Sequence, residues 1–304
     1  MPGEAKALLA AFIWALTIIV LTSQTRRIGA ISLNVVRGSF GGLFLLAIVP
    51  FTSAGGELGD MSAATAIAMV GSGILIFCIG DSLYFLSLPA LGASIAVPLA
   101  ESSYPLITFL IAWLWIGEAL SPVFLIGSGF VVVGIILLSG KGEHPPLIDG
   151  LDGTDSDPVP GLRPRWRLGI PLIAGVAIAW AIGTVWFKAG SGNLGPLSAS
   201  VLRITPAVIL LAPLAHRLPR GLEFRSYRVA DFIGAAFTGV FGVGVAGLLH
   251  VAAIQEIGAS RTSILTATIP LFTLPLAVVF LHERVTPRIV LGTVACVIGL
   301  WFIV

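Results

Sequence analysis

Long apolar runs alternate with short polar links along almost the whole of this 304-residue chain. A run of about 18 or more apolar residues is long enough to cross the hydrocarbon core of a bilayer as an α-helix. The pattern therefore predicts an all-α integral membrane protein with ten transmembrane helices, over residues 5–24, 31–51, 62–87, 92–116, 121–139, 168–189, 196–214, 229–254, 258–281 and 286–304.

One link is much longer than the others. Residues 141–167 are rich in proline, glycine and aspartate, which is typical of a flexible aqueous linker. This linker separates residues 1–140 from residues 168–304, and each part holds five predicted spans. The organisation we expect is therefore two five-helix units joined by a polar linker.

The two parts repeat the same residues at a nearly constant spacing. The spacing is 166 for Trp14/Trp180, for Arg37/Arg203 and for LGAS at 91–94 with IGAS at 257–260. It is 165 for Pro105/Pro270, Glu118/Glu283, Pro122/Pro287, Gly127/Gly292 and Gly134/Gly299. A register kept over so many positions indicates internal duplication. Because each unit has an odd number of spans, the second unit must be inverted relative to the first, an architecture typical of transporters.

The repeated stretches GEALSP and HERVTP mark a tight turn near the end of each part. Ser121 and Thr286 can cap the helix that follows, and the prolines fit its first turn, where no backbone N–H is needed. Glu118 and Glu283 then lie close to a positive helix N-terminus. We interpret both glutamates as structural residues, with a role in substrate binding as the alternative.

Composition fits a membrane protein and narrows the function. Hydrophobic residues make up 57% of the chain and charged residues 11%, whereas soluble domains average roughly 25% charged. The net charge of +2, without a basic-aromatic run, argues against nucleic acid as a partner. Cys78 and Cys296 lie inside apolar runs, and the sequence has no phosphate loop, so we expect no metal, no disulfide and no cofactor.

The end of each part resembles the EamA-type transporters of the drug/metabolite transporter superfamily. The pattern AS…P…E…(S/T)P…G…G closes both parts, and Arg37 and Arg203 lie in the second span of each. The resemblance runs from about Ala10 to Val304. It implies a secondary transporter or exporter of amino acids, nucleotide-linked compounds, drugs or other small metabolites. It also implies a basket-like bundle in which spans 1–4 and 6–9 line a central cavity, while spans 5 and 10 support it from outside.

Ionisable side chains inside the spans are functional candidates, because they are costly at membrane depth. Arg37 and Arg203 either bind substrate, hold the bundle together or extend to the membrane interface. Glu101 is a candidate proton-coupling group, with a static ion pair to Arg37 as the alternative. Asp81 is either a partner of Arg37 or a group in the cavity, and His250 is either titratable or a hydrogen-bonded structural residue.

Polar side chains form one stripe along the fourth span and another along the ninth. The fourth-span stripe recurs at steps of three and four, as on one face of a helix; it comprises Ser94, Pro98, Glu101, Tyr104, Pro105 and Thr108. Its counterpart comprises Thr262, Thr266, Pro270 and Thr273. We expect the two stripes to face each other across a cavity rather than to face lipid.

Four aromatic side chains complete the candidate binding residues: Trp14, Tyr84, Tyr104 and Trp180. They can line an apolar binding surface. The alternative is that they anchor the helices at the membrane interface or fill contacts between helices.

These features favour secondary transport of a small polar metabolite, such as an amino acid, with export as the expected direction and the proton as a candidate coupling ion. Buried arginine and buried glutamate would each meet one end of a zwitterion. The alternatives are export of lipophilic cations, as in multidrug transporters, and lipid scrambling. Enzymatic activity is not expected, because the four histidines are scattered and form no catalytic cluster.

The distribution of positive charge predicts an orientation in the membrane. Outside the second and seventh spans, lysine and arginine concentrate in the links after spans 1, 5, 7 and 9, whereas the opposite side holds only Lys6, Lys188 and Arg261. The positive-inside rule then places both termini outside the cytoplasm of an inner (plasma) membrane. Relatives in the resembling family are described with cytoplasmic termini, so the charges of this chain depart from what the resemblance implies.

Overall fold

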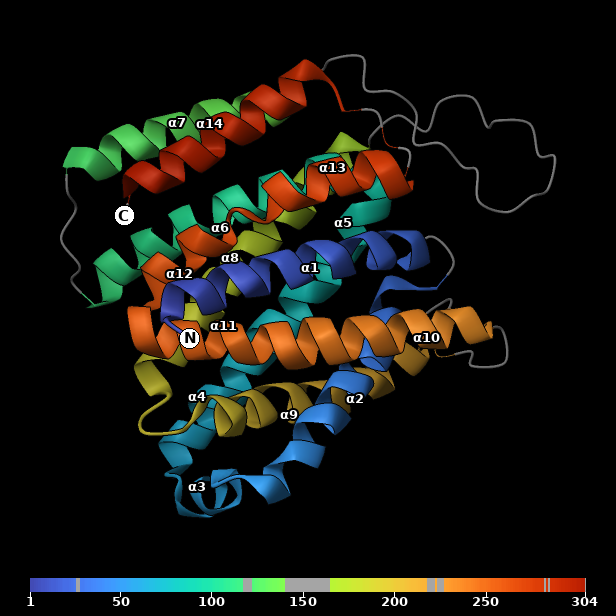
Figure 1. Ribbon diagram of the computed structural model, residues 1–304, viewed down its shortest axis with the longest axis vertical. Coiled ribbons are helices and arrows are strands. Elements are labelled where there is room, and N and C mark those ends of the chain that lie inside the picture. Colours follow the sequence, from blue (N-terminus) through green and yellow to red (C-terminus); the bar gives the residue numbers. More distant parts are fainter. Residues whose placement is uncertain are drawn as a thin grey trace.

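The protein is a bundle of helices that run side by side, as the computed structural model shows (Figure 1). The structure describes residues 1–25, 28–116, 122–139, 165–217, 222, 227–281, 283 and 285–303. Over these residues the secondary structure is helical, and no strand occurs among them. The all-α fold predicted from the sequence is confirmed.

The helices of the first part follow the predicted spans closely. They are α1 (Gly3–Thr25), α2 (Ala30–Ile48), the short 3₁₀ helix η1 (Val49–Phe51), α3 (Ala54–Asp60), α4 (Ala63–Gly73), the π-helix η2 (Ile74–Asp81), α5 (Ser82–Leu91), α6 (Ala93–Ile116) and α7 (Pro122–Ser139). The segments α4, η2 and α5 are continuous and together form the predicted third span.

The second part has the same order of long elements. They are α8 (Trp166–Gly190), α9 (Pro196–Arg217), α10 (Val229–Phe237), the π-helix η4 (Thr238–Ala246), α11 (Gly247–Ile257), α12 (Ala259–Thr266), α13 (Ile269–Leu281) and α14 (Pro287–Ile303). Among the described residues, eight helical stretches are long and apolar enough to cross a membrane, and two shorter apolar stretches, Gly129–Leu138 in α7 and Pro287–Phe302 in α14, lie within the two remaining predicted spans.

The predicted ninth span is not one uninterrupted helix. It divides into α12 and α13, and α12 ends at Thr266. Pro270 explains the break, because a proline has no N–H to donate to the carbonyl four residues earlier and its ring clashes with that carbonyl. Pro98 and Pro105 lie inside α6 without dividing it. The fourth and ninth spans therefore differ in continuity, although their sequences match.

Helices α7 and α14 pack against each other at one side of the bundle, where Figure 1 shows them together. Glycines allow this close contact: Gly134 faces the backbone of Gly292 and the side chain of Cys296, and Gly299 faces the backbone of Gly127. Small residues let helix backbones approach in a membrane. This arrangement matches the outer position that the resemblance implies for these two spans.

Two glycines allow helices to pack closely against α2 and α9 at Arg37 and Arg203, the two arginines that match at the spacing of 166. Gly73 at the end of α4 lies against the backbone carbonyl of Arg203 in α9, and Gly239 in η4 lies against the backbone carbonyl of Arg37 in α2. A side chain at either glycine would collide with that carbonyl. The backbone at each arginine thus packs closely against a helix of the other part of the chain.

Glu283 connects the two parts at the N-terminus of α6. Its carboxylate accepts hydrogen bonds from the backbone N–H groups of Ala93 (3.0 Å) and Ser94 (2.8 Å), where the helix dipole is positive. Glu283 therefore stabilises a helix that is distant in the sequence, which supports the structural interpretation. Thr286 accepts from the N–H of Ile289 at the start of α14 (3.4 Å). Glu118 and Ser121 lie outside the described residues.

Candidate functional site

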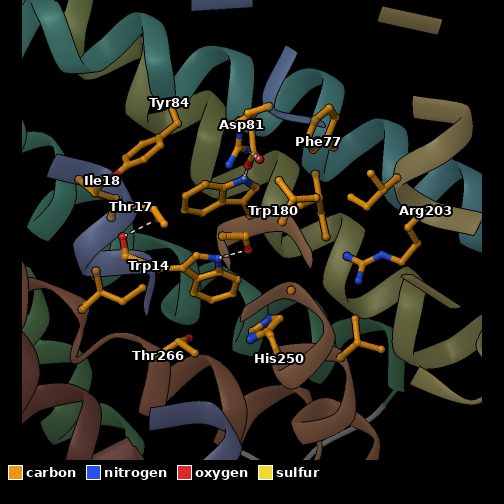
Figure 2. A pocket seen from close by; sticks show the side chains of 18 of the residues that line it. Trp14, Thr17, Ile18, Phe77, Asp81, Tyr84, Trp180, Arg203, His250 and Thr266 are labelled. Atoms are coloured by element: carbon orange, nitrogen blue, oxygen red, sulfur yellow. Dashed lines mark hydrogen bonds and ion pairs between the residues drawn. The ribbon is translucent and has the colours of Figure 1, made fainter. Parts of the chain in front are cut away.

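A cavity of about 160 Å³ lies among the helices of both parts (Figure 2). It is much larger than the roughly 10–15 Å³ that one water molecule needs. Its walls come from α1, α2, α5, α6, α8, α9 and α11–α13, together with residues of α4 and the two π-helices. No residue that lines it belongs to the described parts of α7 or α14.

Ten of the eleven predicted site residues line this cavity: Trp14, Arg37, Asp81, Tyr84, Glu101, Tyr104, Trp180, Arg203, His250 and Thr266. Thr108 is the exception. It is fully buried, and its hydroxyl donates to the backbone carbonyl of Tyr104 (2.8 Å). The structure places Thr108 within the helix packing and not on the cavity wall.

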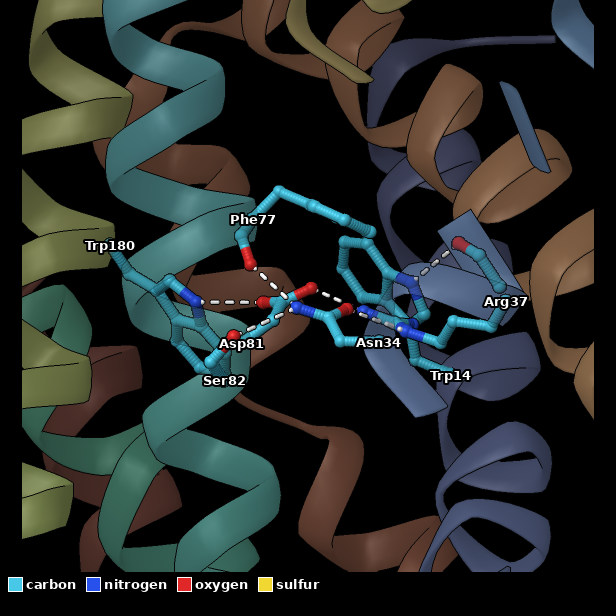
Figure 3. A network of polar contacts seen from close by, with 8 residues as sticks. Trp14, Asn34, Arg37, Phe77, Asp81, Ser82 and Trp180 are labelled. Atoms are coloured by element: carbon cyan, nitrogen blue, oxygen red, sulfur yellow. Dashed lines mark hydrogen bonds and ion pairs between the residues drawn. The ribbon is translucent and has the colours of Figure 1, made fainter. Parts of the chain in front are cut away.

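Arg37 is held in a network of polar contacts at one side of the cavity (Figure 3). Its guanidinium forms an ion pair with Asp81 and donates to Asn34 Oδ1 (3.1 Å). The other oxygen of Asp81 accepts from the indole N–H of Trp180 (3.0 Å). Arg37 is 6% exposed and therefore does not extend to the membrane interface, and its acidic partner is Asp81 rather than Glu101.

Arg203 has a different environment, although it matches Arg37 in the sequence. It is 8% exposed, and its guanidinium lies over the ring of Phe187, 4.8 Å from the ring centroid. Nε is buried without a hydrogen-bond partner, and no carboxylate of the described residues forms an ion pair with the side chain. Figure 2 shows its guanidinium turned toward the cavity. Arg203 thus forms no ion pair with a described residue, and Asp81, which pairs with Arg37, is a carboxylate that acts on it only at longer range.

Glu101 is a second ionisable group in the cavity without a partner among the described residues. Its side chain is 5% exposed, and the carboxyl makes no hydrogen bond or ion pair with another described residue. It lies in α6 four residues before Pro105, so its backbone carbonyl also has no helical N–H partner. The expected alternative of a static ion pair with Arg37 is wrong, because Asp81 occupies that place.

Aromatic side chains cover much of the cavity wall. Trp180 contacts Tyr84 and Tyr104, with ring centroids 5.3 and 5.9 Å apart. Trp14 donates its indole N–H to the carbonyl of Gly242 (2.9 Å) and lies 5.0 Å from the ring of His250. These four aromatic residues lie on the cavity wall and also pack between helices.

Several polar atoms at the cavity are buried without a partner. They include the hydroxyl of Tyr84 and Nδ1 of His250. Tyr104 instead shares a hydrogen bond with Thr184 (3.1 Å), a cavity residue that the sequence pattern did not single out. Buried polar atoms normally have partners, so unpaired ones on a cavity wall indicate where a ligand or water can bind.

The threonine stripe reaches the cavity at one residue. Thr262 and Thr273 donate to carbonyls one turn back in their own helices (2.7 and 3.0 Å) and do not line the cavity. Thr266 also donates to carbonyls of its helix, but it does line the cavity. Of the two predicted stripes, only Glu101, Tyr104 and Thr266 line the cavity.

Apolar helices long enough to span a membrane, arranged around a central cavity with ionisable groups, are typical of multi-pass membrane transport proteins. The sequence model of the EamA-like transporter family matches residues 1–140 and 167–304. The chain belongs to the EamA-like transporter family, and it is accordingly a membrane transporter with a small-molecule substrate. Family membership also favours transport over catalysis.

Two curated relatives carry transporter names. The chain is 26% identical over 298 residues to an uncharacterized transporter of Archaeoglobus fulgidus, and the match covers 97% of this chain and 95% of that protein. It is also 26% identical over 195 residues to the uncharacterized transporter YvbV of Bacillus subtilis (strain 168). That second match spans 62% of this chain but only 55% of the Bacillus protein.

A solved structure shares the fold. A crystal structure aligns with 99% of this chain and 95% of its own length, with a TM-score of 0.68 and 17% sequence identity. At that identity the likeness concerns the fold alone.

Proposed function

We propose that this protein is a secondary transporter, working as an exporter, of a small zwitterionic metabolite such as an amino acid. The observation that carries the proposal is the presence of one basic and one acidic side chain without an ion pair, Arg203 and Glu101, in one cavity. A buried charge without a partner is costly. A substrate with a carboxylate and an ammonium group would supply a partner to each.

Arg37 and Asp81, unlike Arg203 and Glu101, already have partners within the protein and need none from a ligand. They form an ion pair, and Asn34 and Trp180 satisfy further atoms of both side chains. We therefore assign this network to the wall of the site and to the positioning of α2, η2 and α8. Arg203 and Glu101 are the groups that we propose to touch the substrate.

Glu101 also gives a physical basis for coupling to protons. A single carboxyl group can bind a proton or the ammonium group of the substrate, but not both at once. When this exchange is combined with a cavity that opens to either side in turn, proton entry drives substrate exit. Two inverted repeats would provide the two related conformations, and glycines at matching positions, Gly73 and Gly239, support that division of the chain.

The test is a ligand-stabilisation screen of the purified full-length protein against the twenty amino acids, their decarboxylated amines and simple carboxylates. A ligand that binds only the folded state raises the melting temperature in proportion to the logarithm of its concentration over its Kd. We expect amino acids to stabilise the protein and the two truncated series to have little effect. Hits are then measured as uptake into proteoliposomes with and without a pH gradient.

Matched variants connect the result to the two groups. Arg203→Gln and Glu101→Gln should each weaken binding about tenfold or more, which corresponds to roughly 1.4 kcal/mol. Arg261→Gln and Glu256→Gln, both outside the cavity, should not. Amino-acid uptake that is unchanged in Glu101→Gln would contradict the proposed role of that carboxyl group.

Export of lipophilic cations is the second candidate function. The aromatic rings of Trp14, Tyr84, Tyr104 and Trp180 beside Glu101 favour it, because aromatic faces attract organic cations. The unpaired guanidinium of Arg203 disfavours it. Stabilisation by lipophilic cations, without any effect of amino acids, would make this second function the better one.

A further inference from the structure

The charges of the cavity are distributed asymmetrically between the two parts of the chain. At the spacing of 166, Trp14 matches Trp180 and Arg37 matches Arg203. Asp81, the acidic partner of Arg37, matches Gly247. The second part therefore keeps the arginine but has a glycine where the first part has the carboxylate that neutralises it.

The register at this point is supported on both sides of Asp81 and Gly247. The π-helices η2 and η4 end at Asp81 and immediately before Gly247. Further on, Gly92 and Gly258 end α5 and α11 with nearly the same backbone angles, φ 79° and ψ 158° against φ 87° and ψ 167°. These positive φ values favour glycine. The two positions are thus equivalent in local structure as well as in sequence spacing.

The space above Gly247 is open. A Cβ built on Gly247 would have one heavy atom within 4 Å, the carbonyl oxygen of Gly242 at 3.8 Å, which is ordinary contact. Gly73, Gly80 and Gly239 differ, because a Cβ on any of them would overlap a neighbouring backbone or side chain. Gly247 also lines the cavity. The glycine therefore leaves room that a ligand group can occupy.

We infer that the carboxylate of the transported molecule binds in this space, beside Arg203 and above Gly247, where it replaces the missing counterpart of Asp81. The inference rests on the proposed function, since it locates the anionic end of the substrate of the same cavity. It assigns a carboxylate subsite to the second part of the chain and makes Gly247 a specificity-determining residue, because a larger residue would fill the subsite.

The first part of the chain provides the template for how such a carboxylate is held. One oxygen of Asp81 is bound by the guanidinium of Arg37, and the other accepts an N–H from a neighbouring helix. In the second part, Arg203 supplies the guanidinium. His250, which matches Tyr84 at the same spacing, supplies a buried Nδ1 without a partner, which can donate in one tautomer. Figure 2 shows Arg203 and His250 turned toward the same cavity.

The experiment installs the missing acid. In Gly247→Asp the new carboxylate should pair with Arg203 and raise the melting temperature of the ligand-free protein by about 2–4 °C over Gly247→Asn, its uncharged isostere. The gain should disappear in the R203Q background, so that the four variants form a double-mutant cycle with a positive coupling. This readout needs no ligand, so it remains valid if no amino acid is a substrate.

The second arm measures ligand binding. An amino acid that stabilises the wild type should lose at least about tenfold in affinity in Gly247→Asp, whereas in Gly247→Asn a smaller loss is expected because the charge competition is absent. Zero coupling between position 247 and Arg203 would overturn the inference, as would unchanged amino-acid affinity in Gly247→Asp. Failure of both Gly247→Asp and Gly247→Asn to fold would also overturn it, because the space would then not exist.

Discussion

Arg37 and Arg203 show how one residue type takes two roles at matching positions in the chain. Arg37 has a carboxylate, an amide oxygen and two aromatic rings around its guanidinium. Arg203 has one aromatic ring and the cavity. A charge that the protein neutralises contributes to the fold, while a charge left for a ligand costs stability until the ligand binds. Substitution of Arg203 should therefore cost less stability than a substitution that breaks the pair of Arg37 and Asp81.

We expect Asp81→Asn to destabilise the protein by about 3–5 kcal/mol, the usual cost of removing one partner of a buried ion pair. The double variant Arg37→Gln/Asp81→Asn should lose less than the sum of the two single variants, because it leaves no unpaired charge. Arg203→Gln, which breaks no ion pair, should cost less than Asp81→Asn. Thermal unfolding in one detergent measures all four, and additive losses for Arg37 and Asp81 would contradict the pairing.

A second prediction concerns Glu57, which lies in α3 outside the spanning segments. Its carboxylate accepts from Ser198 Oγ (2.5 Å) and from the N–H of Gly195 (2.7 Å), and these hydrogen bonds lower the pKa of Glu57 below its usual range. A carboxyl group with a lowered pKa in the folded state stabilises the fold at neutral pH, and that contribution is lost as the pH falls through the folded-state value.

Glu57→Gln should therefore lower the melting temperature at neutral pH and reduce the additional loss below about pH 4. Asp60→Asn, an exposed change at the end of the same helix, is the matched control and should leave the melting temperature at neutral pH unchanged. The measurement is the melting temperature of each variant between about pH 3 and pH 8, in steps of about one pH unit. A Glu57→Gln profile parallel to that of the wild type would contradict the prediction.

Helices and turns could be predicted well from the sequence wherever the cause is local. Apolar runs located the spans, and the Thr-Pro pair located the start of α14. Pro270 divides its span while Pro105 does not divide α6, because the outcome depends on neighbouring helices that stabilise or displace the freed carbonyl. The contact between Glu283 and the start of α6 joins residues 190 positions apart and left no local signal.

Candidate site residues were found from their polarity within apolar spans, but their partners were not. The choice of Asp81 over Glu101 for Arg37 depends on helix rotation, which spacing along one helix does not specify. Thr108 is a second example. Its spacing predicted a place on the polar stripe that faces the cavity, but its hydroxyl donates to a carbonyl of its own helix, α6. The sequence identifies the polar side chains that need a hydrogen-bond or ion-pair partner inside the bundle, and helix packing determines which partner each of them has.

At the scale of helix packing, Gly239 gives the sharpest prediction. Gly239→Ala would push a methyl group into the carbonyl of Arg37, where two helix backbones meet. Overpacking of this kind costs typically about 1–3 kcal/mol. Gly56→Ala in α3, where the new methyl group would meet nothing within 4 Å, is the control and should be neutral or slightly stabilising. Equal melting temperatures for the two variants would contradict the close approach of η4 to α2.

For the whole molecule, the termini and the charged links define two ends of the bundle. Figure 1 shows both termini at the same end. Lys6 near the start of α1 pairs with Glu256 near the end of α11, which places the link between α11 and α12 at that end too. Arg165, Arg167 and Arg288 lie at the starts of α8 and α14, on the other side. The fold is therefore compatible with a strong asymmetry of charge between the two faces of the membrane.

From this asymmetry the positive-inside rule predicts that both termini lie outside the cytoplasm. Alkaline phosphatase fused to either terminus should then be active in a bacterial host, and a green fluorescent protein fused there should remain dark. Between residues 141 and 164 we expect the opposite: an inserted fluorescent protein should be fluorescent, and an inserted alkaline phosphatase should be inactive. Positive charge acts at the cytoplasmic face because translocating lysine and arginine across the membrane is unfavourable, so added arginines before α1 should increase the population with cytoplasmic termini. Reporters active only in the cytoplasm in the unmodified protein would show that the family-typical orientation prevails over the charges of these links.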